Sequence, residues 1–158
     1  MKTLKKLPDQ IFCTEAPEVI IRSLRISNEP VLNKPQGAFW TSTQYYDAPY
    51  VSAWEEWCRR NDFHCGKNHF LIHPKKDLKV LEPTKVSDLR TIEPDLPLPY
   101  PIIDFEYYAS QGYDGFHLSE KALYMMEADR CMRPFHAWDC ESTAWFNMNW
   151  IDSIERIM

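Results

Sequence analysis

The chain has 158 residues, 44% hydrophobic and 26% charged, which is the composition of a globular protein about the size of one domain. Its net charge of −5 excludes a global basic field for gathering nucleic acid, and its four glycines form no nucleotide-binding glycine-rich loop. No apolar run reaches the length of a signal-peptide core or a membrane span. We therefore expect one cytoplasmic domain over residues 1–158, with no membrane partner.

The first half of the chain predicts two strands and one helix. Residues 18–27 combine β-branched side chains with two arginines and predict a strand, and residues 37–43 predict a second strand after a proline turn. Between residues 48 and 61 apolar side chains recur at helical spacing with charged side chains opposite them, which predicts an amphipathic helix.

The second half predicts further short strands and helices, separated by prolines. Strands are predicted at residues 69–73 and 78–81, and a turn followed by a strand is predicted at residues 113–118. Helices are predicted at residues 87–92, 102–111 and 119–130, the last of them capped by Ser119. Without an internal repeat or a linker, this pattern predicts a compact α+β domain with a mostly antiparallel sheet of short strands.

The segment from Trp138 to Trp150 alternates almost perfectly between two kinds of residue, which predicts a strand through residue 147. One face would carry polar side chains together with an indole: Asp139, Glu141, Thr143, Trp145, Asn147 and Asn149. Two carboxylates would therefore lie side by side on this face. A sheet face that meets water would produce the same pattern.

Cysteine and histidine side chains gather between residues 58 and 73. They are residue types that bind zinc: Cys58, His64, Cys65, His69 and His73. Their spacings match none of the compact zinc patterns, and the chain's five cysteines are irregularly spaced. We therefore predict reduced thiols and no metal site.

Three polar clusters occur on predicted strands or at their ends: Arg22 with Arg25, the segment 40–43, and Asp139 with Glu141. Arg25, the segment 40–43 and the two carboxylates lie within three of five short motifs, which in chain order are R-I-S-N-E-P-V, K-P-Q-G-A-F-W-T-S-T, S-A-W-E-E-W-C, G-Y-D-G-F and W-D-C-E-S. In this order the motifs resemble the arginine, serine/threonine and glutamate motifs of a bacterial and phage branch of the ADP-ribosyltransferases. The resemblance covers most of the chain and implies that the sheet is split and flanked by helices.

The resemblance implies a mono-ADP-ribosyltransferase that binds NAD+, expels nicotinamide and passes ADP-ribose to a macromolecular acceptor. A carboxylate bound to the ribose 2′-hydroxyl stabilises the positive charge that develops as the bond to nicotinamide breaks. Glu141 is the candidate for this catalytic role. Asp139 would orient the acceptor or raise the pKa of Glu141, and the family more usually has Glu or Gln there, which leaves the acceptor open.

The pyrophosphate of NAD+ suits a planar, permanently charged guanidinium. The resemblance indicates Arg25, and Arg22 is its rival because neither face of the predicted strand is clearly the core. Thr41, Ser42 and Thr43 would supply hydroxyls that bind the nicotinamide ribose or hold Glu141 in place.

Aromatic side chains and a glycine complete the expected NAD+ site. Trp40, Tyr45 and Tyr46 offer rings that could stack on the cationic nicotinamide. Gly37 would let the backbone approach the ligand closely.

Other functions remain open on the sequence alone. The same site could pass ADP-ribose to water, as an NAD+ glycohydrolase does, and exposed tryptophans would instead suit a protein-binding module. A glycosidase fits less well, because carboxylates two apart on one strand do not face each other across a sugar. The resemblance further implies a toxin or a phage-defence or host-takeover effector, with an antitoxin-like inhibitor as a possible partner. The acceptor could be a protein side chain or a nucleic-acid base, and the oligomeric state stays open.

Overall fold

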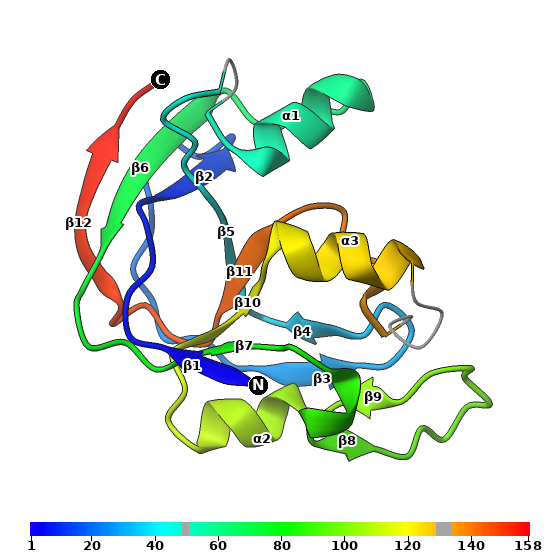
Figure 1. Cartoon of the computed structure of the whole chain (residues 1–158). Coiled ribbons are helices and arrows are strands. Elements are labelled where there is room, and N and C mark those ends of the chain that lie inside the picture. The colour runs from blue at the N-terminus through cyan, green and yellow to red at the C-terminus, as the bar shows by residue number, and fades with distance from the viewer. Residues whose placement is uncertain (49–50, 129–133) are drawn as a thin grey trace.

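A computed structural model describes residues 1–48, 51–128 and 134–158, without the side chains of residues 126–128. Its main element is a strongly curled eight-stranded sheet (Figure 1). In spatial order the strands are β1 (Lys2–Leu4), β7 (Val80–Glu82), β10 (Gly115–Leu118), β11 (Ser142–Trp145), β5 (Phe39–Thr43), β2 (Gln10–Thr14), β6 (Asn68–Pro74) and β12 (Ile151–Arg156).

Smaller elements surround this sheet. Two small sheets pair β3 (Ser27–Glu29) with β4 (Lys34–Gln36) and β8 (Thr91–Ile92) with β9 (Ile102–Ile103). The helices are α1 (Ala53–Arg60), α2 (Phe105–Ser110), α3 (Glu120–Ala128) and the 3-10 turn η1 (Val86–Asp88). Helix α1 contacts β5, and α2 contacts β3 and β4. Among the described residues, none of these helices is long and apolar enough to cross a membrane.

The α+β class is confirmed, but the prediction of a split sheet is wrong. The eight strands form one continuous mixed sheet, in which β10 runs parallel to β7. Parallel neighbours need a long crossover connection. The chain between β7 and β10 provides one, since it contains η1, β8, β9 and α2.

Both faces of the central strands are buried, in contrast to the polar face expected for residues 138–147. Ala144 packs into one apolar cluster with Phe116, whereas its neighbour Trp145 packs into a second with Trp150. Trp145 is 0% exposed. The strand itself is only β11, and Trp138, Asp139 and Glu141 precede it. The alternation therefore reflects a strand packed on both sides, not one that meets water.

The strand predicted at residues 18–27 was wrong over most of its length. Residues 19–26 have no regular secondary structure, and Ile20 and Ile21 are each 59% exposed. Leu24 packs against one apolar cluster and Ile26 against the other, so this segment crosses between the two cores without a partner strand. A β-branched composition favours a strand only where a sheet edge is available to pair with it.

The helices were predicted best where a capping residue fixes the start. Ser52 caps α1, with its hydroxyl 3.3 Å from the Glu55 amide, so the helix begins five residues later than predicted. Ser119 caps α3 as predicted, although the predicted end near residue 130 lies outside the described residues. Asp104 caps α2, and β9 occupies the preceding positions. Residues 87–92 form the end of η1 and then β8 instead of a helix.

Candidate functional site

Glu141 and the Ser42-Thr43 pair meet at the centre of the sheet. Strands β11 and β5 are antiparallel neighbours with Thr143 opposite Thr41, so the residue before β11 comes to lie beside the end of β5. Strand β2 flanks β5 on the other side and places Gln10 opposite Thr43. Residues about a hundred positions apart in sequence are thus brought into contact by strand register.

The Glu141 carboxylate is held by several hydrogen bonds. Its Oε1 accepts from Thr43 Oγ1 at 2.9 Å, and its Oε2 accepts from the Thr43 amide at 3.0 Å. Ser42 Oγ lies 3.2 Å from Oε2 and 2.9 Å from the Glu141 carbonyl oxygen, either of which it can donate to. The side chains of Ser42 and Thr43 therefore hold Glu141 in one rotamer, one of the two roles expected for their hydroxyls.

Burial raises the pKa of Glu141 above its ordinary value, because the residue is only 5% exposed. The hydrogen bonds from Thr43 and Ser42 favour the charged form and oppose this effect without cancelling it. The site thus contains a desolvated carboxylate with a fixed orientation, an arrangement typical of functional sites.

A buried network of hydrogen bonds connects Thr43 to the neighbouring strands. Thr41 Oγ1 donates to Gln10 Oε1 at 2.7 Å and accepts from Trp145 Nε1 at 2.8 Å. Gln10 Nε2 in turn donates to Thr43 Oγ1 at 3.3 Å. Thr41 was predicted to bind NAD+. Its hydroxyl is engaged in this network, and Thr41 also lines the cavity described below, so its role in binding NAD+ stays a prediction.

Sequence analysis missed His117, which lies on β10 beside the carboxylate. Its Nδ1 lies 2.8 Å from Thr143 Oγ1 and 3.7 Å from Glu141 Oε1. Its Nε2 lies 3.9 Å from Glu82 Oε1. Both carboxylates are beyond hydrogen-bonding distance, so burial dominates and lowers the pKa of His117 to about 4. The only signal in the sequence is a single histidine on a predicted strand.

The low pKa of His117 predicts a loss of stability in acid. Between its ordinary value of 6.5 and about 4, the unfolded chain binds a proton that the folded chain does not, so stability falls as the pH falls. We expect His117→Asn, which can keep the hydrogen bond to Thr143, to lose less stability than wild type over this range. Urea unfolding at pH 7 and at pH 5 measures the difference, because these two pH values lie on either side of the ordinary histidine pKa of about 6.5.

The control for this experiment is His64→Asn, because His64 is exposed and its exposed ion pair with Glu15 contributes little to stability. This variant should follow wild type in its pH dependence. Equal acid sensitivity of wild type and His117→Asn would contradict a neutral, buried His117.

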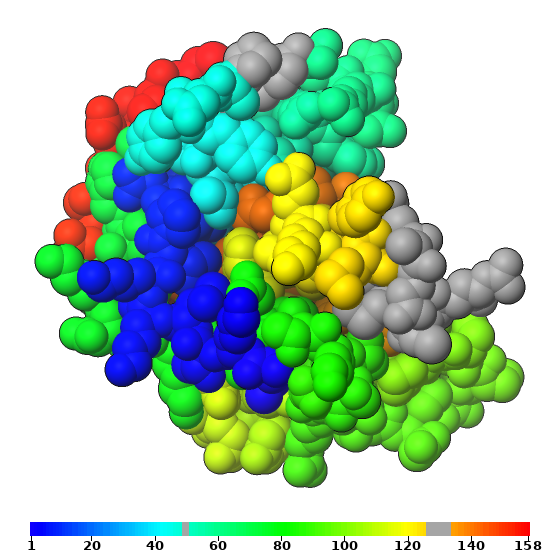
Figure 2. Space-filling view, viewed as in Figure 1, coloured from blue at the N-terminus to red at the C-terminus, as the bar shows by residue number. Residues whose placement is uncertain are grey.

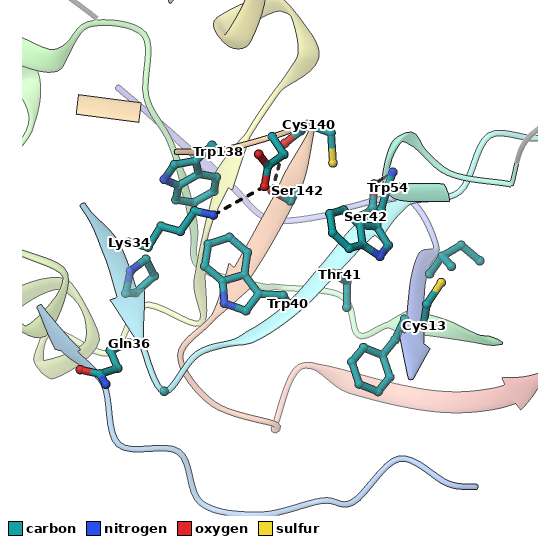
Figure 3. Close-up of a pocket in the computed structure, with 15 residues that line it drawn as sticks. Cys13, Lys34, Gln36, Trp40, Thr41, Ser42, Trp54, Trp138, Cys140 and Ser142 are labelled. Atoms are coloured by element: carbon teal, nitrogen blue, oxygen red, sulfur yellow. Dashed lines mark hydrogen bonds and ion pairs between the residues drawn. The ribbon is translucent and has the colours of Figure 1, made fainter. Parts of the chain in front are cut away.

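A cavity of about 440 Å³ is lined by Ser42 and by Cys140 and Ser142, the two sequence neighbours of Glu141 (Figure 3). Its aromatic lining comes from Trp40, Trp54 and Trp138, and the rings of Trp40 and Trp138 lie 4.8 Å apart. Lys34 Nζ lies 3.9 Å from Asp139 Oδ2 at the wall of the cavity and 5.6 Å from the centre of the Trp40 ring. The volume and the apolar lining are typical of small-molecule sites.

Ser42 connects the cavity to the carboxylate. It lines the cavity, its Oγ lies beside Glu141, and it accepts a hydrogen bond from the Trp54 amide at 3.3 Å. Glu141 itself is not among the lining residues. The Ser42 hydroxyl therefore lies between the Glu141 carboxylate and the cavity.

Asp139 does not lie beside Glu141 as expected. It is an exposed residue that lines the cavity and faces Lys34, whereas the carboxylate of Glu141 faces Thr43. The two carboxylates diverge because both precede β11 and are not held by the alternation of a strand.

Arg25 and Arg22 are both exposed, in the segment without regular secondary structure. Neither lines the cavity, and among its described lining residues the basic one is Lys34. Gly37 does line it, with a φ of +84°, and a Cβ there would lie 2.2 Å from the Arg25 carbonyl oxygen. Gly37 thus brings the backbone of Arg25 close to the cavity wall, and the role of the Arg25 side chain stays a prediction.

Tyr45 and Tyr46 follow β5 but do not line the cavity. Burial, followed by the negative charges of Glu141 and Glu120, raises the pKa of Tyr45. Its buried hydroxyl has no hydrogen-bond partner among the described residues. Figure 2 shows this part of the chain, in cyan, close to the yellow start of α3 with orange atoms visible between them. Tyr46 is 69% exposed and donates to Asp9.

Comparison of the chain with protein-family models, with curated proteins and with solved structures gave no match. The resemblance to the ADP-ribosyltransferases therefore rests on the motifs of the sequence and their order.

Proposed function

We propose that this chain is a mono-ADP-ribosyltransferase that cleaves NAD+ and uses Glu141 to stabilise the transition state. The observation that carries the proposal is the buried Glu141 carboxylate, held by Ser42 and Thr43 beside an aromatic cavity. This is the combination of groups that the sequence motifs imply.

The environment of Glu141 suits the proposed chemistry. As the bond between ribose and nicotinamide breaks, positive charge develops on the ribose, and a carboxylate bound to the 2′-hydroxyl stabilises it. Such stabilisation is strongest where water is excluded and the charged group is already oriented. Glu141 meets both conditions, since it is 5% exposed and hydrogen-bonded on both oxygens.

The cavity supplies surfaces for the rest of NAD+. The indole rings of Trp40, Trp54 and Trp138 offer stacking partners for the nicotinamide cation and the adenine. Lys34 and Arg25 are the two candidates for the pyrophosphate. Lys34 lines the cavity, and Arg25 has the guanidinium that suits two phosphate oxygens.

Asp139 is the candidate group for orienting the acceptor. Its exposed carboxylate at the cavity wall can be reached by a macromolecule, which the buried Glu141 cannot. The acceptor is a protein side chain or a nucleic-acid base. A role as a toxin or phage-related effector with an inhibitor partner follows from the family resemblance alone.

The test is nicotinamide release from NAD+ by the purified protein, together with labelling of a cell lysate from NAD+ labelled in its ADP-ribose part. We expect release, with label that disappears after protease treatment for a protein acceptor or after nuclease treatment for a nucleic-acid acceptor. Release without label would identify a glycohydrolase instead. No release, and no protection of the fold by NAD+ against heat, would refute the proposal and favour a binding module.

A further inference from the structure

A second group of reactive side chains lies where α1, β2 and β6 come together, near the top of Figure 1. Cys13 comes from β2, Cys65 from the loop before β6, and His69 from β6 itself. The Sγ atoms of the two cysteines and a ring nitrogen of the histidine all lie within 4.8 Å of one another. Helix α1 adds Glu55 and Cys58 beside them.

We propose that Cys13, Cys65 and His69 bind a zinc ion, with Cys58 as the fourth ligand. This inference does not depend on the proposed transferase activity. It also replaces the expectation that the irregular spacing of the cysteines excludes a metal site.

The distances fit a tetrahedral ion. With zinc–sulfur bonds of about 2.3 Å and zinc–nitrogen bonds of about 2.0 Å, a sulfur and a nitrogen ligand lie about 3.6 Å apart. Cys65 Sγ and His69 Nε2 are separated by 3.6 Å. The three ligand atoms all lie within 4.8 Å of one another, so small side-chain movements would close the set around an ion.

His69 has the surroundings of a zinc ligand. Its Nδ1 lies 2.6 Å from Glu55 Oε1, and both side chains are about nine-tenths buried. A carboxylate that accepts from Nδ1 leaves the lone pair on Nε2, which is the arrangement that supports metal-bound histidines. Nε2 also lies 2.9 Å from the Gly66 carbonyl oxygen. This oxygen is the partner of Nε2 in the site without an ion, and zinc binding would have to displace it.

Cys58 is placed to complete the set. It is 2% exposed and is the buried residue of α1, the helix that also carries Glu55. Cys13 Sγ lies 3.7 Å from Glu55 Oε1, so the cysteine from β2 also lies against this helix. Cysteine binds zinc as a thiolate, so zinc binding must release protons and weaken as the pH falls.

Gly66 allows the loop to bring Cys65 onto β2. Its φ is +105°, and a Cβ at this position would lie 2.7 Å from backbone atoms of Thr14. The tight approach of this loop to the residue after Cys13 joins ligands from different elements. With Cys13 on β2 and Cys58 on α1 as ligands, the ion would hold α1 against the sheet. Cys13 and Trp54 of α1 both line the cavity, so the ion would also stabilise this wall of the cavity.

The test begins with the metal content of the purified full-length protein, prepared without chelators and with reduced thiols. We expect about one zinc ion per chain in wild type and a loss of bound zinc in Cys13→Ser, Cys65→Ser and His69→Asn. Cys140→Ser and His64→Asn are matched controls outside the cluster and should keep the ion. Replacing zinc with cobalt should give the absorption of a tetrahedral site with thiolate ligands, and Cys58→Ser should weaken its thiolate charge-transfer band.

A further variant tests the role of Glu55 without removing a ligand. Glu55→Gln should weaken zinc binding by about 10-fold to 100-fold, because the histidine loses its carboxylate partner. A wild-type protein that holds no zinc as purified, and that releases no protons when zinc is added, would overturn the proposal and leave the Gly66 carbonyl as the partner of His69 Nε2. Zinc retained in full by Cys13→Ser and Cys65→Ser would overturn it as well.

Discussion

Replacing Glu141 with glutamine should reduce nicotinamide release from NAD+ by about 10²-fold to 10³-fold, the usual effect of removing one group that stabilises charge in a transition state. The glutamine side chain has the same shape and can still accept from the Thr43 amide, which now bonds to Oε2 at 3.0 Å. The loss would therefore come from the missing negative charge. Steady-state kinetics of nicotinamide release, with NAD+ concentration varied, measures kcat and KM separately.

The same substitution should not weaken the fold near neutral pH. Burial raises the pKa of Glu141, so above the ordinary carboxyl pKa the unfolded chain gains a charge that the folded chain accommodates poorly. The stability of Glu141→Gln relative to wild type should therefore rise as the pH increases from acid to neutral. Urea unfolding at several pH values checks this sign.

Asp152→Asn is a suitable control for both measurements, because Asp152 is an exposed carboxylate on β12, at the edge of the sheet. It should match wild type in activity and in the pH dependence of stability. If Glu141→Gln cleaved NAD+ at the wild-type rate, the proposed mechanism would be wrong. If it were inactive but unstable at every pH, the carboxylate would have a structural role instead.

Trp145→Ala should destabilise the fold by about 3–5 kcal/mol, the range for removing a large aromatic side chain from a core. Trp145 is 0% exposed and stacks on Trp150 with ring centres 3.7 Å apart and planes inclined by 6°. It also donates to Thr41 Oγ1, so its loss perturbs the network that positions Thr43. Against a typical total of about 5–15 kcal/mol, this change would leave a marginal protein.

Denaturant unfolding of Trp145→Ala, Trp145→Phe and Trp57→Ala would test this prediction. Trp145→Phe keeps an aromatic ring but loses the hydrogen bond to Thr41, so it should fall between wild type and Trp145→Ala. Trp57 is the matched control, since it stacks on Trp54 in α1 but is only partly buried. A Trp145→Ala variant as stable as Trp57→Ala would contradict the importance of the indole stack.

Local signals in the sequence identified the elements that local chemistry determines. The cap of α3 at Ser119 and the strand that ends at Thr43 were predicted from their own residues and near neighbours in sequence. The segment 18–27 failed because a strand also needs a partner, and no sheet edge is paired with it. The strands β7 and β10 pair in parallel across a crossover of more than thirty residues. Local composition does not indicate which distant strands pair or whether they run parallel.

The candidate site could be predicted only for residues that belong to the sequence motifs, because the order of those motifs indicated which residues meet in the fold. The resemblance placed Ser42, Thr43 and Glu141 together, and the structure brings these three into hydrogen-bonding contact. It gave no reason to single out His117, which reaches Glu141 through the pairing of β10 with β11.

The cluster of Cys13, Cys65 and His69 illustrates the same difficulty for ligand sets. Its first member lies on β2, more than fifty residues before the other two, and joins them through the pairing of β2 with β6. Spacing rules describe ligands carried by one short segment, so they do not apply to a set assembled across strands.

The central position of β11 has a consequence for the order of events during synthesis. This strand is made late in the chain yet lies between β10 and β5, which are made earlier. A nascent chain that ends before residue 141 has neither the carboxylate nor the strand that joins the two parts of the sheet, and domains fold as units once their segments have emerged. Any activity that depends on Glu141 therefore begins only after β11 has left the ribosome, so translation products that stop before β11 would be inert.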